Sequence, residues 1–149
     1  MNEFRAFEDK LAGLIASLSP AARRRMTAEI AKQLRASQQQ RIKRQQAPDG
    51  TPYAARKRQP VKGKKGRVKR EMFTKLRTNR YMKAKGTDNA SMVEFVGRVQ
   101  RMARVHQEGL RDKPNRYSEG VQYEVRPLLG LNSVDRDSVE TLIIKNWNA

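Results

Sequence analysis

Apolar positions recur with helical spacing near both ends of the chain and lose any period in its middle. Near the N-terminus, spacings of three and four predict an amphipathic helix from about Glu3 to Leu18. Ser19 is a favourable N-cap residue and Pro20 fits a first helical position, so a second helix is expected from Pro20 to about Gln46. The residues expected to be buried along this second helix are Met26, Ile30, Leu34 and Ile42.

The second half of that predicted helix is polar and rich in glutamine. Its glutamines are Gln38, Gln39, Gln40, Gln45 and Gln46. We expect this half to project from the core or to pack against another subunit. Pro48, Asp49 and Gly50 then end the helix, because proline disfavours helix in the residue before it and Asp-Gly is typical of turns.

From Thr51 to Arg67 the sequence has no period, several glycines and prolines, and dense positive charge, which predicts a long flexible loop. A short helix is expected from about Val68 to Leu76, with Met72, Phe73 and Leu76 buried. Segments Thr78–Lys85 and Ser91–Val96 flank a turn-rich connection and predict a hairpin.

Three further elements are expected in the last third of the chain. The spacing predicts a helix over Arg98–Gln107, a polar loop over Leu110–Gly120 and a half-buried strand over Val121–Val125. A last helix follows, capped by Asn132 or Ser133. Its expected buried residues are Val139, Leu142, Ile143 and Trp147.

These elements predict one α+β domain over residues 1–149. It has two leading helices, a small and mostly antiparallel sheet, further helices packed on one face, and a long basic loop. A chain of this length leaves much of its surface exposed, so oligomerisation would provide further burial.

Charge is concentrated in the middle of the chain. The segment from Arg41 to Lys85 holds 17 of the 33 lysines and arginines but only two of the 15 acidic residues, Asp49 and Glu71. The flexible part of it, about residues 47–68, is called the basic arm below. Any function assigned to the protein must include what this arm contacts.

The sequence contains no pattern typical of an enzyme or of a cofactor-binding or metal-binding protein. There is no cysteine, and His106 is the one histidine. The acidic residues are scattered, and Gly63–Arg67 lacks the spacing of a phosphate-binding loop. No apolar run approaches a membrane span, and the N-terminus does not resemble a signal peptide, so we expect a soluble protein made in a reducing cytoplasm.

The basic arm has two candidate partners. Lysine and arginine at this density would bind nucleic acid through phosphates, without sequence preference. An acidic protein surface is the alternative, and a solvated loop without a partner is the third interpretation. The candidate contact residues are Arg56, Lys57, Arg58, Lys62, Lys64, Lys65, Arg67, Lys69 and Arg70.

Three stretches, in this order, resemble the phage virion morphogenesis family. The first is FEDKLAGLIASLSPAARRRMTAEIAKQLRASQQQRI leading into APDGTPYAARK, the second is GRVKREMFTKLRT, and the third combines VHQEGL with YEVRPLLGL. Together they span nearly the whole chain. The motif residues taken to be structural are Pro48, Asp49, Gly50, Pro52, Tyr53, His106, Gln107, Gly109, Arg126, Pro127, Leu128, Leu129 and Gly130.

The resemblance implies a late structural protein without catalytic activity, which completes the tail and makes it competent to join a DNA-filled head. It also implies a homo-oligomeric ring of six copies around the DNA channel. Expected partners are other copies of the chain, the neighbouring tail tube or tail terminator, head connector proteins and packaged double-stranded DNA. The expected location is the virion, after assembly in the host cytoplasm. The alternative is a free nucleic-acid-binding protein that uses the basic arm without sequence preference.

Overall fold

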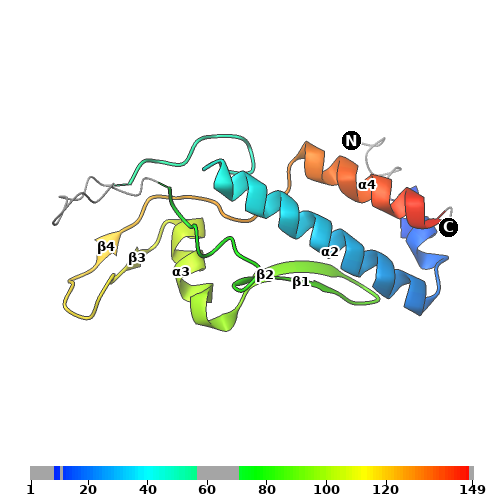
Figure 1. Ribbon diagram of the computed structural model, residues 1–149, viewed down its shortest axis with the longest axis horizontal. Coiled ribbons are helices and arrows are strands. Elements are labelled where there is room, and N and C mark those ends of the chain that lie inside the picture. Colours follow the sequence, from blue (N-terminus) through cyan, green and yellow to red (C-terminus); the bar gives the residue numbers. More distant parts are fainter. Residues whose placement is uncertain (1–8, 11, 57–70, 148–149) are drawn as a thin grey trace. The chain divides into compact units, whose positions relative to one another are not determined.

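The computed structural model describes residues 9–10, 12–56 and 71–147, with the side chain of residue 147 outside the description. The predicted α+β class is confirmed. Helices α2 (Pro20–Lys43), α3 (Gly97–Glu108) and α4 (Ser133–Trp147) accompany two two-stranded sheets (Figure 1). One sheet pairs β1 (Met82–Gly86) with β2 (Ser91–Phe95), and the other pairs β3 (Arg111–Asp112) with β4 (Val121–Gln122).

The two long helices begin at the predicted caps. The Ser19 hydroxyl accepts the Ala22 N–H at 3.1 Å at the start of α2. At the start of α4, the Asp135 N–H donates to the Asn132 side-chain oxygen at 2.9 Å, and the Asn132 N–H donates to the Asp135 carboxylate at 3.2 Å. These bonds satisfy N–H groups that a helix leaves without intrahelical partners.

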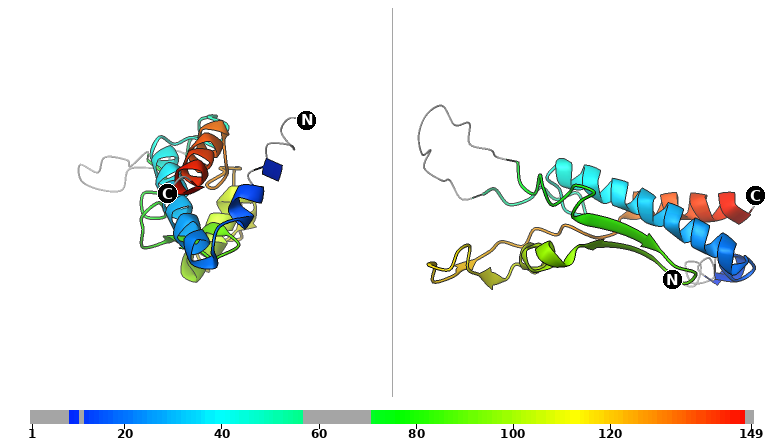
Figure 2. Two further views of the ribbon diagram at one scale, coloured as in Figure 1. Left: turned by 90° about the vertical axis from the view of Figure 1, so that its right-hand side faces the viewer. Right: turned by 60° about the horizontal axis from the view of Figure 1, so that its bottom comes forward.

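The chain divides into two compact units, which are described separately. The first unit comprises Met1–Ser37, Lys83–Glu94 and Leu131–Ala149. Here α4 lies along the first part of α2 (Figures 1 and 2). Their shared core is Met26, Ile30 and Ile143, with Ile15, Leu18, Leu34, Val139 and Leu142 packed against it. The predicted apolar stripes of both helices are thus confirmed, apart from Trp147, whose side chain lies outside the described residues.

The second unit comprises Gln38–Met82 and Phe95–Gly130 and contains α3. Helix α3 follows the prediction closely, and Gly109, with φ 65°, forms its left-handed C-cap. The predicted hairpin over Thr78–Val96 is also confirmed as β1 and β2.

Two local predictions in the second unit were wrong. The described residues of the expected Val68–Leu76 helix form turns at 74–77, and Phe73 has a left-handed φ of 66° that interrupts any helix. Met72 and Leu76 are nevertheless buried, as expected. The expected loop at Leu110–Gly120 contributes strand β3, with Arg111 opposite Gln122, and the expected strand at Val121–Val125 ends after two residues.

Within the described part of the chain, no helix combines the length and the apolar character required to cross a membrane.

Candidate functional site at the root of the basic arm

The described residues on either side of the basic segment 57–70 are called the arm root: residues 45–56 before it and 71–73 after it. The arm root contains a tight turn at residues 47–51. The Thr51 N–H donates to the Asp49 carboxylate at 2.9 Å, and this bond lowers the pKa of Asp49. The Ala47 N–H donates to the Thr51 carbonyl at 2.8 Å. Gly50 has φ 88°, a conformation that other residues rarely adopt, so the predicted turn depends on this glycine.

Pro48 packs directly on the chain near Gly130. A Cβ placed on Gly130 would lie 2.5 Å from the Pro48 ring, so only a glycine fits at this contact without rearrangement. The first and third family motifs therefore touch at this point, although Pro48 and Gly130 are 82 positions apart in sequence.

Tyr53 and Arg126 hold the chain where it leaves the turn. The buried Tyr53 donates its hydroxyl to the Pro127 carbonyl at 2.8 Å, and burial raises the pKa of Tyr53 to about 12. Arg126, only 6% exposed, donates from Nε to Ala54 O at 2.8 Å and from Nη2 to Ala55 O at 3.0 Å. Burial also lowers the pKa of the Arg126 guanidinium. Residues 53–55, shortly before the basic segment, are thus bound to the third motif, Tyr53 through the Pro127 carbonyl and the two alanines through the Arg126 side chain.

A row of aromatic rings crosses the same unit. Tyr53 meets Phe73 with ring centroids 5.6 Å apart, Phe73 meets His106 at 4.8 Å, and His106 meets Tyr123 at 5.0 Å. All three pairs are edge-to-face, an arrangement favoured by the quadrupoles of aromatic rings. The contacts on both sides of Phe73 offset the cost of its left-handed backbone.

His106 is a packing residue whose ring lies between those of Phe73 and Tyr123. Burial is the main cause that lowers its pKa, and the positive charges of Arg126 and Arg56 lower it further. Its buried Nδ1 has no hydrogen-bond partner among the described residues.

Gln107 fixes the backbone of the RPLLG motif. Its side-chain oxygen accepts the N–H groups of Leu128 at 2.8 Å and Leu129 at 2.9 Å, and its amide donates to Leu129 O at 3.0 Å. A segment without regular secondary structure has no ladder for its main-chain groups, so a side chain satisfies them here.

Arg41 and Gln38 hold the same motif from α2. Arg41 is 2% exposed and donates to Leu128 O at 2.8 Å, to Gly130 O at 3.3 Å and to the Gln38 side chain at 2.7 Å. Gln38, also 2% exposed, accepts the Gly130 N–H at 3.1 Å. The prediction that this half of the helix projects from the core was therefore wrong, because its polar side chains are buried against main chain.

Gln45 binds the part of the arm root that follows the basic segment. Its amide donates to Met72 O at 2.8 Å, and its side-chain oxygen accepts the Met72 N–H at 2.8 Å. The described residues on both sides of the basic segment are thus held by pairs of hydrogen bonds. Residues 47–55, at the start of the arm that was expected to be flexible, form defined contacts, and the flexibility of the arm stays a prediction.

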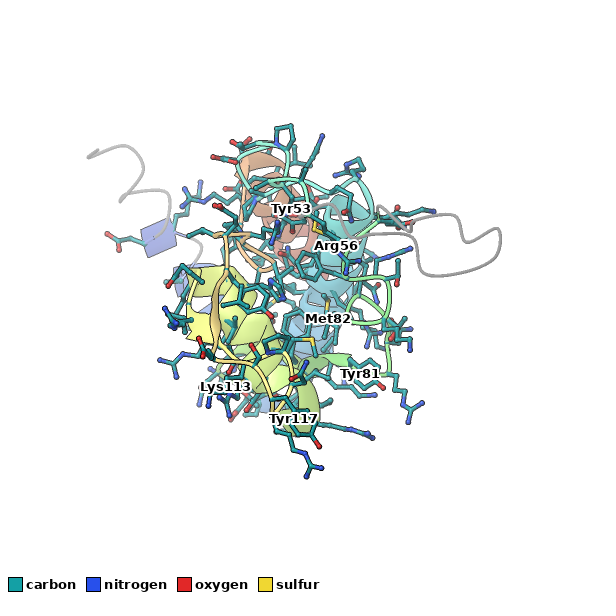
Figure 3. The ribbon with its side chains drawn as sticks, turned by 90° about the vertical axis from the view of Figure 1, so that its left-hand side faces the viewer. Tyr53, Arg56, Tyr81, Met82, Lys113 and Tyr117 are labelled. Carbon is teal, nitrogen blue, oxygen red and sulfur yellow. The ribbon has the colours of Figure 1, made fainter. Side chains whose placement is uncertain are left out.

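The candidate site residues divide into two groups. The structural motif residues, from Pro48 to Tyr53, from His106 to Gly109 and from Arg126 to Gly130, are brought together in the second unit. Of the nine candidate basic contacts, Arg56 is described and exposed, and it is labelled with Tyr53 in Figure 3. The other eight lie outside the described residues, namely Lys57, Arg58, Lys62, Lys64, Lys65, Arg67, Lys69 and Arg70.

The structural roles of Gln38, Arg41 and Gln45 were not predicted from the sequence. These residues lie at spacings of three and four, around the buried Ile42. That periodic polar stripe is the available signal, and a pattern of apolar residues alone does not identify it.

The polar side chains in and around the arm root have structural roles. Main-chain groups are bound by Arg41, Gln45, Gln107 and Arg126. The described residues hold no group of three or more histidine, cysteine or acidic side chains that could bind a metal ion. Their arrangement holds the chain on both sides of the cationic segment.

Comparison with known proteins defines the class of protein. A model of the phage virion morphogenesis family matches residues 2–147, so the chain belongs to this family, as its motifs predicted. A curated relative is the tail completion protein S of Escherichia phage P2, which is 49% identical over 145 residues, or 97% of either chain. No solved structure matches significantly.

Proposed function

We propose that this protein completes the phage tail and mediates head–tail joining as a homo-oligomeric, hexameric ring around the DNA channel. The single observation that carries the proposal is the 49% identity to a tail completion protein over nearly the full length of both chains. The protein acts in the virion, after assembly in the host cytoplasm. Its neighbours are other copies of itself, the tail tube or tail terminator, and the head connector.

Exposed apolar side chains of the first unit support self-association. Helix α4 packs Val139, Leu142 and Ile143 against the core, yet it also exposes Val134 (68%) and Ile144 (46%). Helices that are apolar on more than one side usually bury those sides against something. Leu131, just before α4, is 58% exposed as well. We assign this outer surface to a neighbouring subunit.

The basic arm is the proposed contact with packaged DNA. A ring would bring one such segment per copy to the channel, where the summed positive field attracts phosphates. The arm root supports this role, because hydrogen bonds to Ala54 and Met72 hold the described chain on both sides of the basic segment. The proposal contains no catalytic step, since the polar groups at the arm root are already bound to main chain.

Self-association is tested with paired variants of α4. Val134→Lys and Ile144→Lys together should reduce the mass measured by light scattering from that of a ring to that of a single chain, and should prevent incorporation into tails. Gln33→Lys and Ala36→Lys together, at exposed positions of α2 in the first unit, are the charge-matched control and should assemble normally. A double variant that assembles like its parent would refute the assignment of this surface. A parent chain that stays monomeric, binds DNA and is absent from tails would favour the free DNA-binding alternative.

A further inference from the structure

The described residues of the second unit form a cationic hollow. It has a volume of about 450 Å³ and lies between α3 and the loop that joins β3 to β4. Its lining includes Arg98, Arg101, Met102, Asp112, Lys113 and Arg116. Figure 3 labels Lys113 and Tyr117 on that loop, well apart from Arg56 at the arm root.

Positive charges outnumber negative ones in the lining of this hollow. Asp112 binds Arg101 at 2.7 Å, which neutralises one of the four cations. Arg98, Lys113 and Arg116 are exposed and form no ion pair with the residues that the structure describes. Three uncompensated positive charges on one surface favour a polyanionic ligand.

The loop that presents two of these charges is held in place. The Arg101–Asp112 pair joins β3 to α3, and the Gln122 amide donates to Gly109 O at 2.6 Å. Within the loop, the Tyr117 N–H donates to the Asn115 side chain at 2.9 Å, and the Ser118 N–H donates to Asn115 O at 3.2 Å. Cations on a fixed support lose less conformational entropy on binding than cations on a free chain.

Tyr117 distinguishes between two classes of polyanion. It is 83% exposed, and Arg116 lies 5.0 Å from its ring centroid and donates to its hydroxyl at 2.8 Å. An exposed tyrosine beside arginine offers a hydroxyl for a sugar or phosphate and a ring face for an unpaired base. An acidic polypeptide would gain less from such a ring.

We propose that α3 and the β3–β4 loop form a second nucleic-acid-binding surface, which contacts the sugar–phosphate backbone through Arg98, Lys113 and Arg116. This surface extends the proposed function, on which it rests for the expectation that DNA is near. It acts independently of the basic arm, so that DNA is contacted both by a charged segment and by a fixed surface of the same subunit.

The test compares charge-matched variants by fluorescence anisotropy, with a short duplex, a single strand and polyglutamate as probes. The surface variant is Arg98→Gln, Lys113→Gln and Arg116→Gln. Its control removes three exposed cations elsewhere in the second unit, by Lys43→Gln, Arg44→Gln and Lys75→Gln. An arm variant changes Lys57, Arg58, Lys62, Lys64 and Lys65 to Gln.

The surface variant should bind duplex more weakly, with the slope of log affinity against log salt reduced by about three, since each lost phosphate contact removes about one. The control should lose clearly less affinity for duplex.

A surface variant whose duplex affinity matches that of the control, or that loses affinity for polyglutamate alone, would overturn the proposal. Loss of all duplex binding in the arm variant would also overturn it, while leaving the proposed role of the arm intact. Unchanged duplex binding in the arm variant would refute the arm's role and leave this surface standing. A single strand bound far better than duplex would identify unpaired DNA as the ligand.

Discussion

The two parts of α2 are stabilised in opposite ways. In the first unit, the helix buries Met26 and Ile30 against Ile143 of α4, a conventional apolar contact. In the second unit, its last turns bury Gln38 and Arg41, which bind the main chain of residues 128–130. Apolar packing tolerates substitution by residues of similar volume, whereas a hydrogen-bonded arrangement requires particular donors at particular positions.

Because of this difference, the geometry around the arm root depends most on the identity of individual side chains. Residues 127–130 and 54–55 lie outside helices and strands, and side chains bind several of their carbonyl and N–H groups. The first unit, by contrast, has an apolar core on one side of α4 and exposed apolar residues on another. We therefore propose the first unit for association between subunits and the second for holding the chain on both sides of the basic segment.

The largest expected effect on stability concerns Arg41 in the second unit. Arg41→Met should destabilise the fold by about 3–5 kcal/mol, because it leaves two main-chain carbonyls and the Gln38 side chain without their donor. Arg44→Met, at an exposed position three residues later, should change stability by less than about 0.5 kcal/mol. Chemical denaturation measures both. Equal effects would show that the buried arginine is not a structural requirement.

The apolar unit offers a matched pair of adjacent isoleucines. Ile143→Ala should cost about 2–4 kcal/mol, because Ile143 is 5% exposed within the core, whereas Ile144→Ala should cost about 1 kcal/mol or less in the free chain. In the assembled ring, Ile144→Ala should cost more than it does in the free chain, since Ile144 would then be buried against a neighbouring subunit. Denaturation of the free chain at low concentration and complementation of tail assembly are the two measurements. A stable ring containing Ile144→Ala at parental strength would contradict the proposed contact.

Acidification should weaken the second unit through His106. Its pKa in the folded protein lies below the ordinary value of 6.5, so between these values the unfolded chain binds more protons than the folded chain. The free energy of unfolding should therefore be constant above about pH 6.5 and fall as the pH is lowered through and below this value. His106→Phe keeps a ring in the aromatic row and should lose this part of the pH dependence. An identical pH profile for both proteins would show that His106 protonates freely in the fold.

The smallest effect concerns the turn at the arm root. Gly50→Ala should destabilise by about 1 kcal/mol, since alanine must adopt the φ of 88°. Gly13→Ala lies in the helical segment 12–16, where an added Cβ meets no atom within 4 Å, and it should stabilise slightly. Thermal melts of the two variants should therefore shift in opposite directions. A shift in the same direction would mean that the two glycines do not differ as their backbones indicate.

The sequence predicted those parts of the fold that follow an apolar period. Met26, Ile30 and Ile143 lie where their spacing placed them, and the caps at Ser19 and Asn132 begin their helices as expected. The sequence did not predict the arrangement of the second unit. Gln107 binding to residues 128 and 129 joins positions about twenty apart, and no local pattern encodes such a pairing.

The candidate site was predictable in part for the same reason. The family motifs identified the residues that meet at the arm root, since Pro48, Tyr53, Gln107 and Arg126 all take part in its contacts. Their partners on α2 were missed because a buried polar face has the period of a helix without its usual composition. Phe73 was expected in a helix, and its left-handed backbone follows from tertiary contacts with Tyr53 and His106.

The proposed ring can be seen in a side-chain-resolution cryo-EM map of the head–tail junction in assembled particles. We predict a closed ring of six copies at the end of the tail, with Val134 and Ile144 of each copy buried by a neighbour. We also predict that residues 57–70 enter the channel from the arm root and that the motif contacts around Tyr53 and Arg126 are preserved. A particle that lacks the protein, or a ring whose basic segments all point away from the DNA and rest on protein, would contradict the proposal.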